Sequence, residues 1–197
     1  NSVFGYESGL NIGVGTSNSF FGYESGEATT TGSSNSFFGL QSGVANTTGS
    51  FNSLFGNSTG ATITTGSANS AFGYAALDSV GIGTSNAALG YLAGDDLTSG
   101  NSNTLIGAFA GQSLTTGSGN IVLGYNADAL AIDASNNLNI GNLIFGTGLG
   151  SGTTLASGNI GIGASLPSQT LSIQGTVGIG YTGSQLSAGA VLAMNGN

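Results

Sequence analysis

The chain of 197 residues contains no lysine, arginine, histidine, cysteine or tryptophan, and a single proline. Without cysteine and histidine, the sequence excludes zinc, haem, iron–sulfur and thiol sites. Without histidine, lysine and cysteine, the usual general bases and activated nucleophiles are missing, and only carboxylates and hydroxyls remain. The sequence therefore predicts a protein that is not an enzyme, with no catalytic, cofactor-binding or metal-binding residues.

Charge is scarce, since charged residues make up 4% of the chain and all eight are acidic. Without lysine and arginine nothing neutralises phosphates, which argues against nucleic acid and anionic membrane surfaces as partners. No run of 18 apolar residues is present, so we expect no membrane span, and we expect no signal peptide at the first residue. Because 39% of residues are hydrophobic, the chain is too apolar to be kept unfolded by its charge.

Repetition is what the sequence has in abundance. An asparagine recurs every 17 residues, at Asn1, Asn18, Asn35, Asn52, Asn69, Asn86, Asn103, Asn120 and Asn137. A glycine follows four residues after each asparagine, and a bulky apolar residue precedes that glycine, at Phe4, Phe21, Phe38, Phe55, Phe72, Leu89, Ile106, Leu123 and Ile140. Nine matching copies indicate a tandem-repeat architecture.

The length of the unit selects a β-structure. Helical hairpin repeats need about 33 residues, and frequent glycine disfavours helices. We therefore predict an all-β fold, a parallel β-solenoid of about 17-residue coils. Each coil is expected to hold two short strands, at positions 2–5 and around positions 11–14. Coils stacked about 4.8 Å apart would place asparagine on asparagine as an amide ladder, and the Phe4 column in the interior.

A second apolar column runs beside the first. It holds Val3, Phe20, Phe37, Leu54, Ala71, Ala88, Leu105 and Val122. Neighbouring residues of a strand point to opposite faces, and a strand that is apolar on both faces is covered on both. Another chain would supply the second cover, which predicts self-association, most simply a homotrimer. The alternative is that one column forms a modest patch on a wetted outer face.

The array divides into three parts. Residues 1–141 form the regular repeats, residues 142–158 an irregular Gly/Thr/Ser-rich insertion that we expect to be looped out, and residues 159–197 divergent C-terminal repeats. The first and last residues both match the repeat asparagine, so we expect the chain to be part of a longer array.

At this point the repeats resemble known proteins. The segment from Asn1 to Gly5 and its copies resemble the Asn-Ser-Val-Ala-Ile-Gly repeats of trimeric autotransporter adhesin heads. The unit from Asn86 to Gly94 is similar to repeats of bacteriophage tail fibres and related bacterial surface proteins. Residues 158–175 resemble the region upstream of an endosialidase-type C-terminal chaperone domain.

The resemblance implies a left-handed, homotrimeric β-roll in an extracellular location, on a virion tail or a cell surface. It also implies contact with a cell-surface glycan through a tip that lies outside this chain. Two departures affect the expected handedness and cross-section. The 17-residue unit is longer than the adhesin-head unit, and phenylalanine replaces a smaller aliphatic residue.

The acidic residues fall into columns. Glu7 and Glu24 share one column, and Glu27, Asp78 and Asp95 share another. Stacked carboxylates repel and would be relieved by a cation, but the calcium-binding nonapeptide pattern is absent, so solvated surface charge is the favoured interpretation. Asp95 and Asp96 are adjacent in a turn, unlike the separated carboxylates of a glycosidase.

Two further columns suggest binding. A flat threonine ladder would suit ice or O-linked sugars, and it would comprise Thr30, Thr47, Thr64, Thr98 and Thr115 with Thr31, Thr48, Thr65 and Thr116. A tyrosine stripe would suit carbohydrate, and its members are Tyr6, Tyr23, Tyr74, Tyr91 and Tyr125. Two N-glycosylation patterns occur, Asn46-Thr47-Thr48 and Asn57-Ser58-Thr59.

The sequence favours a non-catalytic structural shaft of an extracellular fibre, either a phage tail fibre or a bacterial surface appendage or adhesin. In that interpretation turn formation and β-propensity explain the threonines, and the tyrosines lie on the fibre interface. The alternative is a glycan- or ice-binding β-solenoid that acts through the tyrosine or threonine column.

Overall fold

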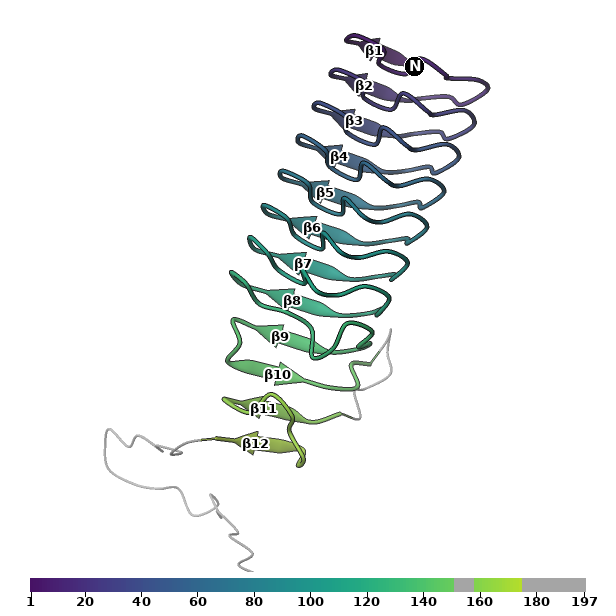
Figure 1. The fold of residues 1–197 in the computed structure, drawn as a ribbon. Helices are drawn as coiled ribbons and strands as arrows, with labels where there is room; N and C mark the ends of the chain where they lie inside the picture. The colour runs from purple at the N-terminus through teal and green to yellow at the C-terminus, as the bar shows by residue number, and fades with distance from the viewer. Residues whose placement is uncertain (151–157, 175–197) are drawn as a thin grey trace, which may run out of the picture.

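The computed structural model describes residues 1–150 and 158–174, and they build one twelve-stranded sheet whose strands follow chain order (Figure 1). The strands are β1 (Ser2–Phe4), β2 (Ser19–Phe21), β3 (Ser36–Phe38), β4 (Ser53–Phe55), β5 (Ser70–Phe72), β6 (Ala87–Leu89), β7 (Thr104–Ile106), β8 (Ile121–Leu123), β9 (Leu138–Ile140), β10 (Ile144–Gly146), β11 (Ile160–Ile162) and β12 (Leu171–Ile173). The predicted all-β parallel solenoid is confirmed, because β1 to β9 pair in parallel and each residue lies beside its counterpart 17 positions on.

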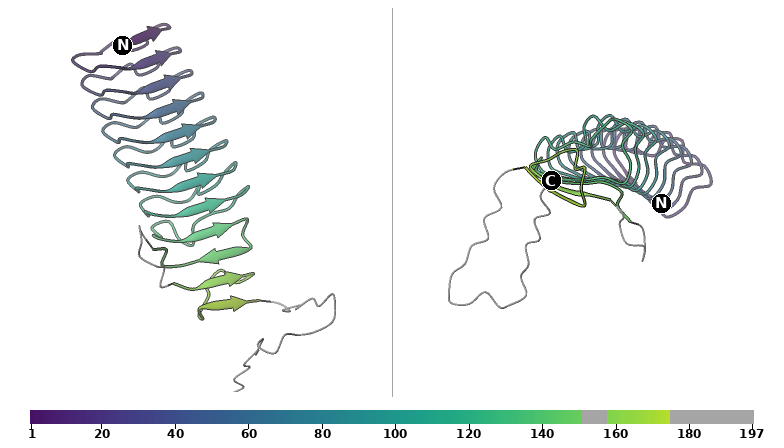
Figure 2. Two further views of the ribbon diagram at one scale, coloured as in Figure 1. Left: turned by 180° about the vertical axis from the view of Figure 1, so that it is seen from behind. Right: turned by 90° about the horizontal axis from the view of Figure 1, so that it is seen from below.

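Each coil contributes one strand to this sheet and returns through a chain of turns (Figure 2). The second strand predicted around positions 11–14 does not form in the described coils. Isolated hydrogen bonds join that side of the stack instead, for example from the Thr30 N–H to the Thr47 carbonyl at 2.9 Å and from the Thr47 N–H to the Thr64 carbonyl at 2.9 Å. The glycines and turns on this side interrupt the ladder, because a regular strand needs consecutive extended residues.

The asparagine column lies inside the coil, and its side chains hold the stack together. The Asn35 amide donates to the carbonyl of Gly49 in its own coil at 2.9 Å, and its oxygen accepts from the Asn52 backbone N–H of the next coil at 2.9 Å. From Asn52 to Asn120, successive side chains also bond to one another at 3.0–3.2 Å. The predicted amide ladder is therefore confirmed over this range.

The interior is filled by the other apolar column. Phe20, Phe37 and Leu54 have no exposed surface, whereas Phe4 is 75% exposed on the opposite face of the sheet. The prediction that the Phe4 column is the interior line is therefore wrong. Alternation along a strand gives the reason: Asn1 points inward to make its hydrogen bonds, so residue 3 of each unit also points inward and residue 4 points outward.

Side-chain sizes are matched across the interior. A Cβ added to Gly43 would lie 2.6 Å from the Phe37 ring, so the glycine makes room for the ring. One coil reverses this arrangement, because Ala71 replaces the large residue and the fully buried Leu77 replaces the glycine six positions later. Leu77 also reaches toward the next coil, where a Cβ added to Gly94 would lie 2.9 Å from it. The cross-section is therefore kept constant although its residues change.

The regular stack ends in a change of strand direction. β10 lies between β9 and β11 and pairs with both in the antiparallel sense, and β11 then pairs with β12 in parallel. The prediction that the whole stretch from Leu143 is looped out is thus wrong for residues 144–146, and residues 151–157 of that insertion lie outside the described part. Phe145 is only 8% exposed and pairs with Asn139, so it follows the interior column.

The Asn69→Ala substitution tests the asparagine ladder. It removes the acceptor of the Asn86 N–H, at 3.0 Å, and the donor to the Gly83 carbonyl, at 2.9 Å. An unpaired buried polar group costs about 1–3 kcal/mol. We therefore expect the free energy of unfolding, measured in urea, to fall by about 1–3 kcal/mol or more. The exposed Asn11, whose side chain makes no hydrogen bond, provides the matched control Asn11→Ala. Equal stability losses in the two variants would contradict the structural role of the ladder.

Size matching across the interior is tested at Leu77. Leu77→Ala leaves a cavity in a fully buried position and should reduce the free energy of unfolding by about 2–5 kcal/mol. The double variant Ala71→Leu with Leu77→Gly recreates the Leu54 and Gly60 pair of an earlier coil, so it should recover most of that loss. A double variant that is no more stable than Leu77→Ala would show that the two positions do not share one volume.

Candidate functional site

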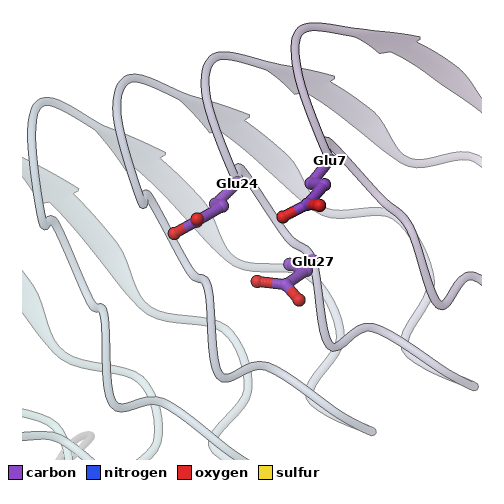
Figure 3. A group of neighbouring side chains, drawn as sticks. All are labelled: Glu7, Glu24 and Glu27. Atoms are coloured by element: carbon purple, nitrogen blue, oxygen red, sulfur yellow. The ribbon is translucent and has the colours of Figure 1, made fainter.

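Three glutamates converge at the N-terminal end of the stack (Figure 3). The carboxylate oxygens of Glu7, Glu24 and Glu27 lie within 4.8 Å of one another, and all three side chains are half-buried. The sequence placed Glu7 and Glu24 in one column and Glu27 in another, and the turn between the two columns brings them together. Gln41 donates from Nε2 to Glu24 at 2.7 Å, which satisfies one of these oxygens.

The glutamates raise the pKa values of the adjacent tyrosines. The pKa of Tyr6 is raised because its phenol is hydrogen-bonded to Glu7 and lies in the field of that carboxylate. The pKa of Tyr23 is raised in the same way by Glu24. Hard cations such as calcium prefer oxygen ligands, but they take six to eight of them. Three surface carboxylates therefore supply part of a coordination sphere, and the sequence-based interpretation as solvated charge stays a prediction.

A second acidic pair lies farther along the same flank. Burial raises the pKa of Asp78, partly offset by a hydrogen bond from the Ala61 backbone, and one carboxylate oxygen of Asp78 is buried without a partner. The pKa of Asp95 is raised by burial first and then by the charges of Asp78 and Asp96. The ionised forms of these two carboxyl groups are therefore less stable than those of exposed carboxyl groups.

The tyrosine column consists of two stacked pairs and the separate Tyr125, because Leu40, Asn57 and Ala108 interrupt it. Tyr6 and Tyr23 lie 5.3 Å apart between ring centroids with planes 14° apart, and Tyr74 and Tyr91 lie 5.2 Å apart at 13°. Within each pair the two rings cover one another's facing sides. A sugar that stacks on an aromatic residue needs an open ring face, so the column offers less carbohydrate-binding surface than the spacing of its tyrosines suggests.

The threonine hydroxyls are engaged within the stack. Thr47 donates to the Thr64 carbonyl at 3.0 Å, and Thr98 donates to the Thr115 carbonyl at 3.0 Å. The column of Thr30, Thr47, Thr64, Thr98 and Thr115 thus contributes hydrogen bonds between coils, as expected from its turn chemistry. The hydroxyls of the adjacent column, Thr31, Thr48, Thr65 and Thr116, make no such bonds, so the ladder is engaged on one side only.

The two N-glycosylation patterns differ in access. Asn46 is fully buried, so its side chain is not accessible for glycosylation in the folded chain. Asn57 is exposed, but Thr59 of the same pattern is buried and its hydroxyl bonds to the Gly73 carbonyl at 2.6 Å.

The outer face of the sheet carries a regular line of apolar side chains. Phe21, Phe38, Phe55 and Phe72 form a continuous ladder with ring centroids 4.8–4.9 Å apart and planes within 7° of parallel. Leu89, Ile106, Leu123 and Ile140 continue it. The antiparallel β10 keeps the line intact, because Ile144 pairs with both Ile140 and Ile162.

We call this line of twelve side chains, from Phe4 to Ile173, the outer stripe. Sequence reasoning noticed both apolar columns but assigned this one to the interior. The inward asparagine one residue before each strand is the signal that identifies it as external.

No family model, curated protein or solved structure matches the chain. The part of the chain that the structure describes holds no helix long and apolar enough to cross a membrane.

The pH dependence of stability tests the burial of the Asp78 carboxyl group. Its pKa is raised above the ordinary value of 3.8, so the carboxyl group favours the folded state when it is protonated and disfavours it when it is ionised. The melting temperature should therefore fall as the pH rises from below 3.8 through the raised pKa. Asp78→Asn should raise the melting temperature at pH 7 and remove part of this pH dependence.

The exposed Asp133 provides the control, since Asp133→Asn makes the same change of charge at the surface. If both substitutions shift the melting temperature at pH 7 equally, net charge and not burial of Asp78 is the cause.

Proposed function

We propose that this chain is the structural repeat shaft of an extracellular fibre, non-catalytic and homotrimeric, in a phage tail fibre or a bacterial surface appendage. The observation that supports it most directly is the unbroken stack of coils, joined from one coil to the next by β-pairing and by the buried asparagines. A rod made in this way spans distance at about 4.8 Å per coil and needs no site of its own.

The work of such a shaft is mechanical. Force along the rod is shared by hydrogen bonds that repeat in every coil, and the interior packing is continuous from one coil to the next. A receptor would be bound by a tip outside this chain, and the resemblance to adhesin heads and tail fibres suggests a cell-surface glycan as its target. The absence of lysine and arginine removes every trypsin-type cleavage site, which suits an exposed location.

Oligomerisation is supported by the outer stripe. Its exposed side chains include Phe4 at 75%, Leu89 at 52% and Ile173 at 38%. Soluble monomers rarely leave contiguous apolar patches larger than a few hundred Å². A stripe that runs the length of the rod is more apolar surface than a monomer ordinarily leaves to water, and copies of the chain would cover it.

Native mass spectrometry and negative-stain electron microscopy test this function together. We expect a mass three times that of the chain and straight rods about 50 Å long, because the twelve strands are separated by eleven spacings of ~4.8 Å each. Glycan-array and ice-recrystallisation assays on the same sample should show no activity. A monomeric mass, or specific binding of a glycan or of ice by this chain alone, would overturn the proposal in favour of a binding module.

A further inference from the structure

The outer face of the sheet carries two columns of side chains, and the size of the side chain in one column varies with the size of its neighbour in the other. Each strand presents its first and third residues outward. In β1 to β5 the pair is a serine and a phenylalanine, whereas in β8, β9, β11 and β12 it is two large aliphatic residues. The strands β6 and β7 are intermediate, with Ala87 and Leu89 and with Thr104 and Ile106, and the antiparallel β10 departs from the pattern with Ile144 and Gly146. A small residue in the first position of the strand thus lies beside a phenylalanine ring in the third position. In β8, β9, β11 and β12, where the third position is aliphatic, the residue in the first position is larger.

Such coupling is expected of enclosed positions. In a packed space the summed volume of neighbouring side chains is restricted, and cores tolerate changes that conserve it. On a wetted surface two neighbouring columns carry no such restriction. The same matching occurs in the coil interior, where Ala71 accompanies Leu77, and there the positions are fully buried. The outer face therefore has the residue pattern of an interface.

The area of the stripe is sufficient for a stable contact. A buried aromatic side chain covers about 150–250 Å². Eight residues of the stripe are 38–75% exposed, and Phe38, Phe55, Leu123 and Ile144 are half-buried. With the outward aliphatic residues of β8, β9, β11 and β12, the face offers on the order of 800 Å² per chain, the share of one partner in a standard interface.

The chemistry of the face selects a second copy of this chain as the occupant. None of the outward positions of the twelve strands carries a charge, so the face offers a foreign partner no charge to recognise. All eight carboxylates lie elsewhere on the chain, so copies can approach through this face without opposing charges directly. The phenylalanine ladder repeats every 4.8–4.9 Å, and a surface with the same repeat, such as another copy, matches it at every level.

We propose that copies of this chain meet through the outer stripe, side by side, pointing in the same direction and with equivalent coils at equal height. This inference rests on the proposed homotrimer, because a closed ring of three identical rods about a common axis requires parallel chains at one level. Each level then repeats one pair of side chains around the axis, with rings beside rings in β1 to β5 and aliphatic residues beside aliphatic residues from β8 onward.

An apolar hollow marks the level at which rings give way to aliphatic residues. It has a volume of ≈340 Å³ and is lined by Ser70, Phe72, Ala87, Ala88, Leu89 and Ile106. In the parallel arrangement the hollows of all copies meet at the same height. In an antiparallel pair about a central axis, the phenylalanines of β1 to β5 would instead face β8 to β12, four of which carry two large aliphatic residues.

Direction and level are measured with spin labels, since the chain has no native cysteine. Single variants Ser19→Cys in β2 and Leu138→Cys in β9 are labelled separately, and distances between equivalent labels are measured by pulsed electron paramagnetic resonance. We expect short and closely similar distances at both sites. Thr65→Cys, on the turn side of the coil, should give clearly longer distances.

An antiparallel pair would give a different pattern. The two sites are seven strand spacings apart, about 34 Å at ~4.8 Å each, so they cannot both be short in one antiparallel arrangement. A long distance at either site in an oligomeric sample overturns the parallel, level arrangement. A monomeric sample overturns the proposed homotrimer itself, so the two failures are distinguished.

The contact face is tested by matched charges. Phe55→Glu places one carboxylate per copy in the stripe, whereas Thr65→Glu adds the same charge on the exposed turn side. Because Phe55 lies outside the coil interior, circular dichroism of both variants should match that of the parent chain. We expect at least a tenfold loss of oligomer for Phe55→Glu and no loss for Thr65→Glu. Oligomers that survive Phe55→Glu, or dissociate equally in both variants, overturn the assignment of this face.

Discussion

The structure depends on one buried side chain per coil. From Asn1 to Asn120, each repeat asparagine donates to a carbonyl of its own coil and accepts from the backbone of the next, as Asn52 does with Gly66 and Asn69. In a chain with no cysteine and no lysine or arginine, neither disulfides nor side-chain ion pairs can hold coils together. Hydrogen bonds shielded from water are stronger electrostatically than exposed ones, and an unpaired partner costs more there. The amide is therefore suited to join coils where no charge is present.

The same side chain determines which apolar column is exposed. Because the asparagine points inward, parity along the strand sends Phe20 inward and Phe21 outward. The asparagine thus connects the fold to the proposed assembly. It builds the rod by linking coils, and it leaves the outer stripe on the surface, where another copy would cover it.

The sequence predicted most of the architecture, because a fixed period makes stacked residues equivalent. The coil length, the parallel pairing, the asparagine ladder and the structural use of the threonines all follow from residue type at one repeat position. The period alone does not say which face of a strand is inside. With Val3 and Phe4 both starting apolar columns, hydropathy left the choice open, and only the hydrogen-bonding needs of Asn1 resolve it.

Features that break the period escaped prediction. The antiparallel β10 is three residues long and lies in a stretch whose composition is typical of a loop. Its pairing depends on the partner strands β9 and β11 on either side, not on a local signal. The convergence of Glu7, Glu24 and Glu27 depends on how the turn between two columns closes, which spacing along the chain does not specify.

The backbone shows why a single coil would not persist alone. Two positions of the repeat adopt left-handed conformations with residues other than glycine, such as Phe51 at a φ of 61° and Leu92 at 52°. Each such residue costs roughly 1–2 kcal/mol. Hydrogen bonds from the neighbouring coil fix these residues, as when the Leu92 N–H donates to the Tyr74 carbonyl at 2.9 Å. Strain that arises within one coil is therefore offset by contacts between coils, so stability grows with the number of coils stacked. A chain with this energy balance is stable as a long rod, and length is the property that the proposed shaft requires.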